Sequence, residues 1–226
     1  APSDGLLAFG GYGAMGSLGE ILLVEPLSGD LVQALDSHRQ TVCSLAFSAD
    51  GNALASCDVA GQAVLWNRDG WKPTVLARPD DATYGADAAR LIANQPKLRP
   101  IAVLGNQYVV IPAYQGLTDG RLRWKLKLLR LDDPRQTRTL DTPHDDLVTV
   151  LAASPDGTLL IVSRQGYVAE VEPQAGRLIQ RIGEAALAGA WPQSIDVDDA
   201  GNLYVTTQIP TVVAVLGGEG HRLVSR

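Results

Sequence analysis

The sequence predicts an all-β protein, because its apolar residues come in short runs rather than in long helical stretches. The runs are rich in β-branched residues and are joined by small polar turns, which is the pattern of antiparallel hairpins. One turn recurs at intervals of roughly 45 to 55 residues, and such self-similarity indicates a repeat architecture. The glycine of this turn stands at Gly5, Gly51, Gly105, Gly157 and Gly201.

Each repeat carries up to four apolar runs. In the second repeat these are "VCSLAF", "NALAS", "QAVLWN" and "PTVLAR". Four short strands in a unit of roughly 40–50 residues are typical of a propeller blade. We therefore predict a single all-β domain or subdomain over residues 1–226, a β-propeller of about five four-stranded blades. The approximate repeats are residues 1–37, 38–79, 80–143, 144–186 and 187–226.

The first repeat lacks the first of its four runs. Its opening, "APSDGLLAFGG", matches "ASPDGTLLIVS" of the fourth repeat only from the turn onward. Propellers usually build one blade from both ends of the chain, which leaves no open sheet edge. We expect an incomplete propeller or part of a larger one: a proteolytic product, half of a split propeller or a truncated sequence. A self-contained five-bladed ring with an irregular first blade is the alternative.

Composition limits the function classes. The chain has 226 residues, 46% of them hydrophobic and 19% charged, which is typical of a folded protein with a substantial core. A formal net charge of −6 argues against a general nucleic-acid binder. No apolar run is long enough to cross a bilayer, so we expect no membrane insertion. We expect a cytoplasmic protein, with the periplasm or secretion as alternatives.

Residues 38–67, "HRQTVCSLAFSADGNALASCDVAGQAVLWN", closely resemble a WD repeat. A histidine precedes the first run, a Ser-x-Asp-Gly turn follows it, and a tryptophan closes the third run. The resemblance implies a protein–protein interaction scaffold or sensor module, held in a larger protein or complex. One alternative is a periplasmic enzymatic or electron-transfer propeller subunit that works with a cofactor or metal. The other is a structural accessory subunit.

The resemblance also implies a buried hydrogen-bond set of histidine, strand-two serine or threonine, turn aspartate and strand-three tryptophan. Ala60 stands at the usual aspartate position of the second repeat, and Gln165 and Val171 depart from the family in the fourth. We therefore expect the set to be incomplete in both repeats. The matching residues are His38, Ser56 and Trp66 in the second repeat, and His144 and Ser163 in the fourth.

Titratable residues give little support to catalysis. The three histidines lie in different repeats, whereas a zinc site needs three or four ligands brought together. The sequence has no Gly-x-Ser-x-Gly elbow. Asp196 and Asp198 share a strand face and could line a central channel, although an aspartate before glycine also simply makes a turn. We expect no catalytic residue, no metal and no cofactor, and we expect Cys43 and Cys57 to be buried free thiols.

The most distinctive local feature is the alternating basic run "RLRWKLKLLR" (121–130). Its basic residues occupy every second position, so that a strand would carry them on one face. Cations are costly to bury, so we expect a hairpin that projects beyond its blade or lies on an exposed side. It would dock an acidic partner protein or the missing part of the propeller, and a solvated face is the alternative. The alternating residues are Arg121, Arg123, Lys125 and Lys127, and Arg130, Arg135 and Arg138 extend the patch.

Three more residues are candidates for partner contacts. Tyr84 and Arg90 lie in the long connection "PDDATYGADAARLIANQPKL" (79–98), and long connections often carry function. Trp191 precedes the first run of the fifth repeat, where an exposed tryptophan would suit a binding hot spot. A tryptophan tucked between blades is the alternative for Trp191.

Overall fold

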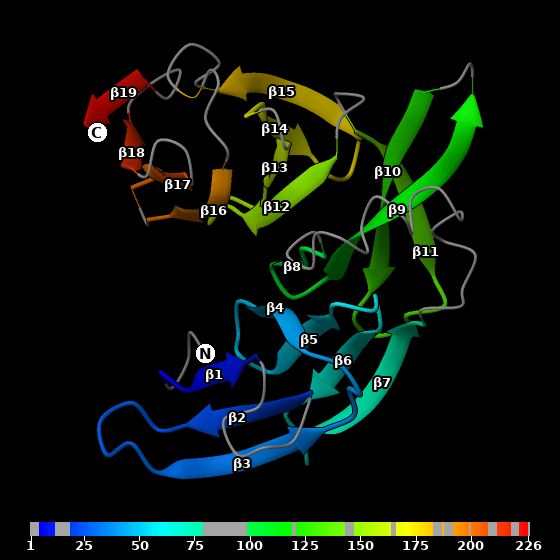
Figure 1. Ribbon diagram of the computed structural model, residues 1–226, viewed down its shortest axis with the longest axis vertical. Coiled ribbons are helices and arrows are strands. Elements are labelled where there is room, and N and C mark those ends of the chain that lie inside the picture. Colours follow the sequence, from blue (N-terminus) through cyan, green and yellow to red (C-terminus); the bar gives the residue numbers. More distant parts are fainter. Residues whose placement is uncertain are drawn as a thin grey trace. The chain divides into compact units, whose positions relative to one another are not determined.

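A computed structural model describes the greater part of the chain. The described residues are 5–11, 19–78, 99–118, 121–142, 147–163, 166–182, 187, 192–198, 200–207, 212–217 and 222–225. The regular elements within these residues are nineteen β strands, which confirms the all-β class (Figure 1). No helix that could cross a membrane occurs in the described part of the chain.

The strands form five sheets, and in each sheet the strand order follows the order along the chain. The first sheet is β1 (Leu7–Gly10), β2 (Glu20–Val24) and β3 (Leu31–Asp36). The second is β4 (Val42–Phe47), β5 (Ala53–Asp58), β6 (Ala63–Asn67) and β7 (Lys72–Ala77). The third is β8 (Ala102–Leu104), β9 (Tyr108–Thr118), β10 (Arg121–Arg130) and β11 (Thr137–Asp141).

The fourth sheet is β12 (Val148–Ala153), β13 (Leu159–Ser163), β14 (Val168–Glu172) and β15 (Arg177–Ile182). The fifth is β16 (Pro192–Val197), β17 (Leu203–Thr207), β18 (Val212–Gly217) and β19 (Arg222–Ser225). The neighbours in the first, second, fourth and fifth sheets pair antiparallel, as a chain of hairpins requires. Four sheets therefore have four strands, and the first sheet has three among the described residues.

The recurring glycine closes the first hairpin of a sheet. In the fourth sheet the Gly157 N–H donates to Ser154 O at 2.9 Å, and Gly157 has a φ of 87°. This left-handed conformation is the reason that glycine recurs there. The hairpin of the second sheet is one residue longer, because Ser48 N–H reaches Ala53 O whereas Ser154 N–H reaches Thr158 O.

The described structure divides into two compact units. One contains Ala1–Ile111 and Leu128–Thr137, and the other contains Pro112–Lys127 and Arg138–Arg226. In the first unit, the first and second sheets share a core, and the opposite face of the second sheet packs on the third. In the second unit, the fourth and fifth sheets share a core. Residues at the centres of these three cores are Ile21, Leu23, Leu54 and Trp66; Ala55, Leu65, Val109 and Ile111; and Leu160, Val162, Leu203 and Val205.

Candidate functional site

A buried set of polar side chains lies in the second sheet. His38 precedes β4, and its Nε2 lies 2.7 Å from the Ser56 hydroxyl on β5. The indole N–H of Trp66, on β6, donates to the same hydroxyl at 2.8 Å. Nδ1 of His38 lies 3.2 Å from a carboxylate oxygen of Asp58, the last residue of β5. An ionised carboxylate only accepts hydrogen bonds, so the N–H at Nδ1 of His38 is the donor of this hydrogen bond and Asp58 is the acceptor.

The order Ser56–His38–Asp58 is that of a nucleophile, a base and an orienting acid. Catalysis would require a substrate carbon within reach of the serine oxygen. Ser56 has an exposed fraction of 0% and His38 one of 2%, and the serine oxygen already accepts the Trp66 N–H. The set is therefore closed to solvent, and it ties the segment before β4 to β5 and β6.

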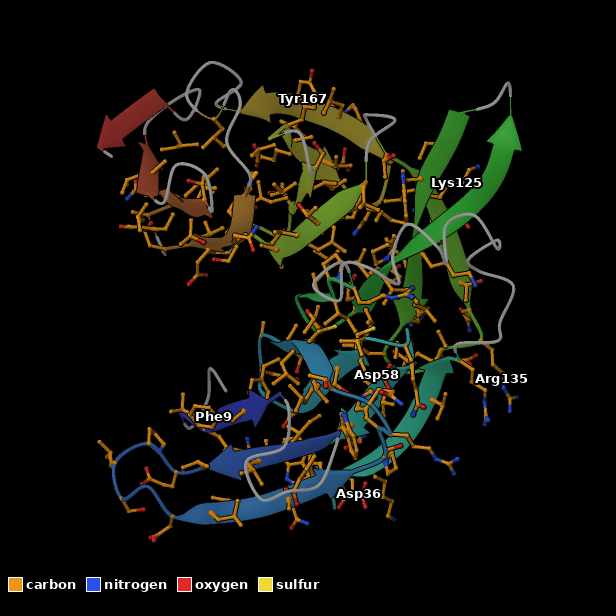
Figure 2. The ribbon with its side chains drawn as sticks, in the orientation of Figure 1. Phe9, Asp36, Asp58, Lys125, Arg135 and Tyr167 are labelled. Carbon is orange, nitrogen blue, oxygen red and sulfur yellow. The ribbon has the colours of Figure 1, made fainter. Side chains whose placement is uncertain are left out.

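Asp58 was missed by the sequence analysis. The expectation that Ala60 leaves the set incomplete in the second repeat is wrong, because Asp58 supplies the carboxylate from within the strand. Its other oxygen accepts the Gln62 N–H at 2.9 Å, so one side chain holds both the histidine and the turn to β6. Figure 2 labels Asp58. The signal was available, since Ser56 and Asp58 are two residues apart on a strand and therefore share a face.

In the fourth sheet, the register places Ser163 at the position of Asp58 rather than at that of Ser56. Ser163 is opposite Val148, the first residue of β12, as Asp58 is opposite Val42, the first residue of β4. The Ser163 hydroxyl accepts the Tyr167 N–H at 3.2 Å, which is the turn contact that Asp58 makes with Gln62 in the second sheet. Ser163 thus closes a turn.

The counterparts of Ser56 and Trp66 in the fourth sheet are Ile161 and Val171. Ile161 lies two residues before Ser163, and Val171 is opposite Leu159 as Trp66 is opposite Leu54. Ile161 has an exposed fraction of 0% and Val171 one of 2%. Apolar packing thus replaces the polar set here, and replacing both partners of a hydrogen bond with apolar groups leaves no unsatisfied group. His144 lies outside the described residues.

The basic run forms β10, and its alternation sorts the side chains by face. Trp124, Leu126 and Leu128 are buried, whereas Lys125 and Lys127 are half-buried. The Lys125 ammonium lies 3.1 Å from a carboxylate oxygen of the exposed Asp141 on β11. Figure 2 labels Lys125. The side chains of Arg121 and Arg123 lie outside the described part, although both residues belong to β10.

The β9–β10 hairpin extends past the first strand of its sheet. β8 pairs with Tyr108, Val109 and Val110, and β9 continues to Thr118. Beside the hairpin base, Arg130 donates from Nε to Asp132 at 2.8 Å. This hydrogen bond lowers the pKa of the Asp132 carboxyl. Arg130 and Asp132 line a hollow of about 250 Å³ together with Asn106, Gln107 and Tyr108.

The remaining candidates for partner contacts lie outside the described residues. These are Tyr84, Arg90 and Trp191. They stay sequence-based candidates.

The acidic residues of the fifth sheet are engaged locally. Asp198 accepts hydrogen bonds from the Asn202 side chain and backbone and from the Tyr204 hydroxyl, which lower its pKa. Asp196 accepts the N–H of Val197. Within the described residues, no three histidine, cysteine, aspartate or glutamate side chains gather closely enough to hold a metal.

Cys43 and Cys57 carry free thiols on neighbouring strands of the second sheet. Cys43 is half-buried, and its thiol lies 3.4 Å from the carbonyl oxygen of the buried Cys57. The neighbouring Cys57 side chain lowers the pKa of Cys43. The Cys43 side chain, together with burial, raises the pKa of Cys57.

Comparison with known proteins identifies the repeat. Residues 29–67 match the family model of the WD domain, G-beta repeat, from just before β3 to the end of β6. The β-propeller domain of Cps50 (Swd1) from Myceliophteria thermophila superposes with a TM-score of 0.65 at 14% identity, over 93% of this chain and 61% of that chain. The WD40 β-propeller domain of Doa1 gives a TM-score of 0.66 at 17% identity, over 97% of this chain and 63% of that chain. The chain has the β-propeller fold, and its residues 29–67 resemble a WD repeat.

The predicted fold class is therefore confirmed, with the five sheets as the blades of the propeller. A protein of unknown function from Bacteroides caccae also shares the fold, with a TM-score of 0.62 at 13% identity over 98% of this chain and 71% of that chain. The propeller spans 61% and 63% of the Cps50 and Doa1 chains. No curated protein matches the sequence.

Proposed function

We propose that this propeller is a protein-interaction scaffold of the WD-repeat type, working as part of a larger protein or complex. The observation that carries the proposal is the basic row on β10, defined as residues 121, 123, 125 and 127. The basic residues alternate along the strand with apolar residues, of which Trp124, Leu126 and Leu128 are buried. A strand anchored by its apolar face presents the opposite face in a fixed register.

The charge of this row contrasts with that of the chain. The formal net charge is −6, so a run of basic residues is a local reversal of sign. The neighbouring Asp141 pairs with Lys125, but Asp141 is exposed, and a surface ion pair of this kind contributes little. Complementary charge raises the association rate and sets the orientation of an acidic partner.

The experiment is affinity capture with the full chain from cells of its own source, followed by identification and quantification of the retained proteins. The Arg121→Gln/Arg123→Gln double variant should retain a specific partner at least about tenfold less, which corresponds to about 1.4 kcal/mol. Retention by the wild-type chain should also fall steeply as ionic strength rises, because salt screens exposed charges.

The matched control is Lys72→Gln/Arg177→Gln, which removes two exposed cations from β7 and β15. It should retain the partner as the wild-type chain does. Equal capture by the wild-type chain and both double variants would mean that the basic row is only solvated surface.

A further inference from the structure

The first strand of the second sheet carries a β-bulge at Cys43. Val42 is opposite Asp58 and Ser44 is opposite Cys57, so β4 holds one extra residue between these two pairs. Cys43 and Ser44 therefore both oppose Cys57. Opposite residues of an antiparallel pair have Cα atoms about 4.5–5.5 Å apart, which lies within the range of about 4.4–6.8 Å that disulfides span. The register thus places the two cysteines where a disulfide can join them.

The bulge directs the Cys43 side chain toward β5. The Cys43 thiol donates to Cys57 O at 3.4 Å. β12 carries the same bulge, and there the Thr149 hydroxyl donates to Val162 O at 3.3 Å. The bulge therefore aims its side chain at the opposite residue in both sheets. The second sheet has a thiol at each of the two positions, and the chain contains no other cysteine.

Both cysteines lie on the side of the second sheet that packs on the third. Cys57 belongs to the core that contains Ile101 and Val109, and the Cys43 sulfur lies 4.0 Å from Arg99 O, shortly before β8. The Arg99 side chain is also buried, with an exposed fraction of 6%. A guanidinium is always charged, and a positive environment of this kind is typical of reactive cysteines. All of these residues belong to the first unit.

The two thiols differ in how readily they ionise. The Cys57 side chain, and after it the charge of Arg99, lower the pKa of the half-buried Cys43, which favours its nucleophilic thiolate. The Cys43 side chain and burial raise the pKa of Cys57, and the negative charge of the Cys43 thiolate adds to that rise. A group that caps Cys43 removes this charge, so capping of Cys43 makes it easier for Cys57 to lose its proton.

We propose that Cys43 and Cys57 form a reversible thiol–disulfide exchange site that a small disulfide oxidises. The Cys43 thiolate attacks one sulfur of the small disulfide, whose S–S bond breaks; Cys43 becomes a mixed disulfide and one small thiolate leaves. Cys57 then loses its proton and attacks the Cys43 sulfur; the Cys43–Cys57 bond forms as the mixed disulfide breaks, and a second small thiolate leaves. The two cysteine thiols are oxidised, the small disulfide is reduced to two thiols, and the two cysteine protons end on those thiols.

The site is independent of the basic row, because neither thiol belongs to β10. Its test therefore does not depend on the proposed interaction with a partner protein.

The test incubates the full chain with hydroxyethyl disulfide near neutral pH and then blocks the remaining thiols with N-ethylmaleimide. Trypsin leaves both cysteines in one fragment, because no lysine or arginine stands between Arg39 and Arg68. Cleavage before aspartate separates the cysteines into residues 36–49 and 50–57. Mass spectrometry should recover these two fragments as one species, with the summed mass less two hydrogens. Dithiothreitol should separate them again.

Variants assign the role of each residue. Cys57→Ala should accumulate the mixed disulfide at Cys43, and Cys43→Ala should slow the modification of Cys57 at least about tenfold. Arg99→Gln should slow the modification of Cys43 at least about threefold near neutral pH, and a higher pH should restore the rate. The probe is uncharged, so this effect reports the thiolate and not attraction of the probe.

Two controls accompany the variants. Arg39→Gln removes an exposed cation ahead of β4 and should leave the rate within about twofold. In concentrated urea, Cys43 and Cys57 of the wild-type chain should react at equal rates, because the fold alone makes them different. The two alanine variants carry the test if Arg99→Gln does not fold.

Three results would overturn the proposal. A mixed disulfide at Cys43 that persists in the wild-type chain would leave Cys57 without a part in the reaction. Disulfides between two chains, in place of the link within one chain, would assign the thiols to a dimer. Thiols that stay reduced in the folded chain, under conditions that oxidise them in urea, would mean that the fold protects both.

Discussion

The first and second sheets pack on each other, yet they differ in how completely they are covered. The second sheet has four strands, and each of its faces contributes to a core. The first has three strands among the described residues; its Ile21 and Leu23 face the shared core, while Leu7 and Phe9 are exposed. The same strand pattern is therefore buried where neighbours lie on both sides, and it leaves apolar side chains exposed on β1 among the described residues.

Truncation of one large aromatic residue in each sheet should give the largest difference in unfolding free energy between the two sheets. Trp66→Ala should lower the free energy of unfolding by about 3–5 kcal/mol, because the indole is 1% exposed and would leave a cavity. Phe9→Ala should lower it by about 1 kcal/mol, since roughly half of that ring is already in water. Urea unfolding of both variants measures the difference. Equal losses would mean that β1 is covered in solution.

The polar set offers a comparison between the second and fourth sheets. Asp58→Ala should cost about 1–3 kcal/mol of unfolding free energy, because buried His38 and the Gln62 N–H both lose an acceptor. Ser163→Ala should cost about 1 kcal/mol, since it removes one turn contact.

Ala60→Asp is the control for the position of the carboxylate. It should change the free energy of unfolding by less than about 0.5 kcal/mol, because Asp58 already satisfies His38. A stabilisation of more than about 1 kcal/mol would contradict the assignment of Asp58.

The two thiols of the second sheet should differ in reactivity. Cys43 should react with iodoacetamide at least about tenfold faster than Cys57 near neutral pH, because the thiolate is the nucleophile. The neighbouring Cys57 side chain lowers the pKa of Cys43, and the Cys43 side chain together with burial raises the pKa of Cys57. Mass spectrometry of the modified peptides over time measures both rates. Faster labelling of Cys57 would contradict the burial of β5.

The smallest expected effect lies in the turn of the second sheet. Hydrogen bonds from the Ser48 hydroxyl and the Asn52 N–H lower the pKa of Asp50. Its contribution to stability is therefore present above the unfolded pKa of about 3.9 and is lost as the pH falls through the lower, folded value. Carboxyl NMR should show Asp50 titrating below about 3.9, and Ser48→Ala should raise that pKa. An unchanged pKa in the variant would remove the serine from the explanation.

Much of the fold could be predicted from sequence because its signals are local. Short apolar runs gave the strands, and a glycine at positive φ, such as Gly51 or Gly157, marked the hairpins. The three strands of the first sheet among the described residues also followed from counting runs. These features depend on residues only a few positions apart, so no tertiary information was needed.

The buried polar set was harder to predict from the sequence, because it depends on the register between the strands of each hairpin. The first hairpin of the second sheet is one residue longer than that of the fourth, so aligning both on the glycine displaced the strand positions. Alignment on the glycine pairs Ser163 with Cys57, one position from its counterpart Asp58, and matching serine with serine displaced it by one more position, to Ser56. The Lys125–Asp141 pair joins β10 to β11, and no spacing in the sequence reports that contact.

Hydrogen exchange of the full chain tests most directly whether the first sheet is open where the second is closed. The account predicts that the amides of Ala53–Asp58 exchange through global unfolding, and that those of Leu7–Gly10 include sites at least about 100-fold faster. Equal protection of β1 and β5 would contradict the account.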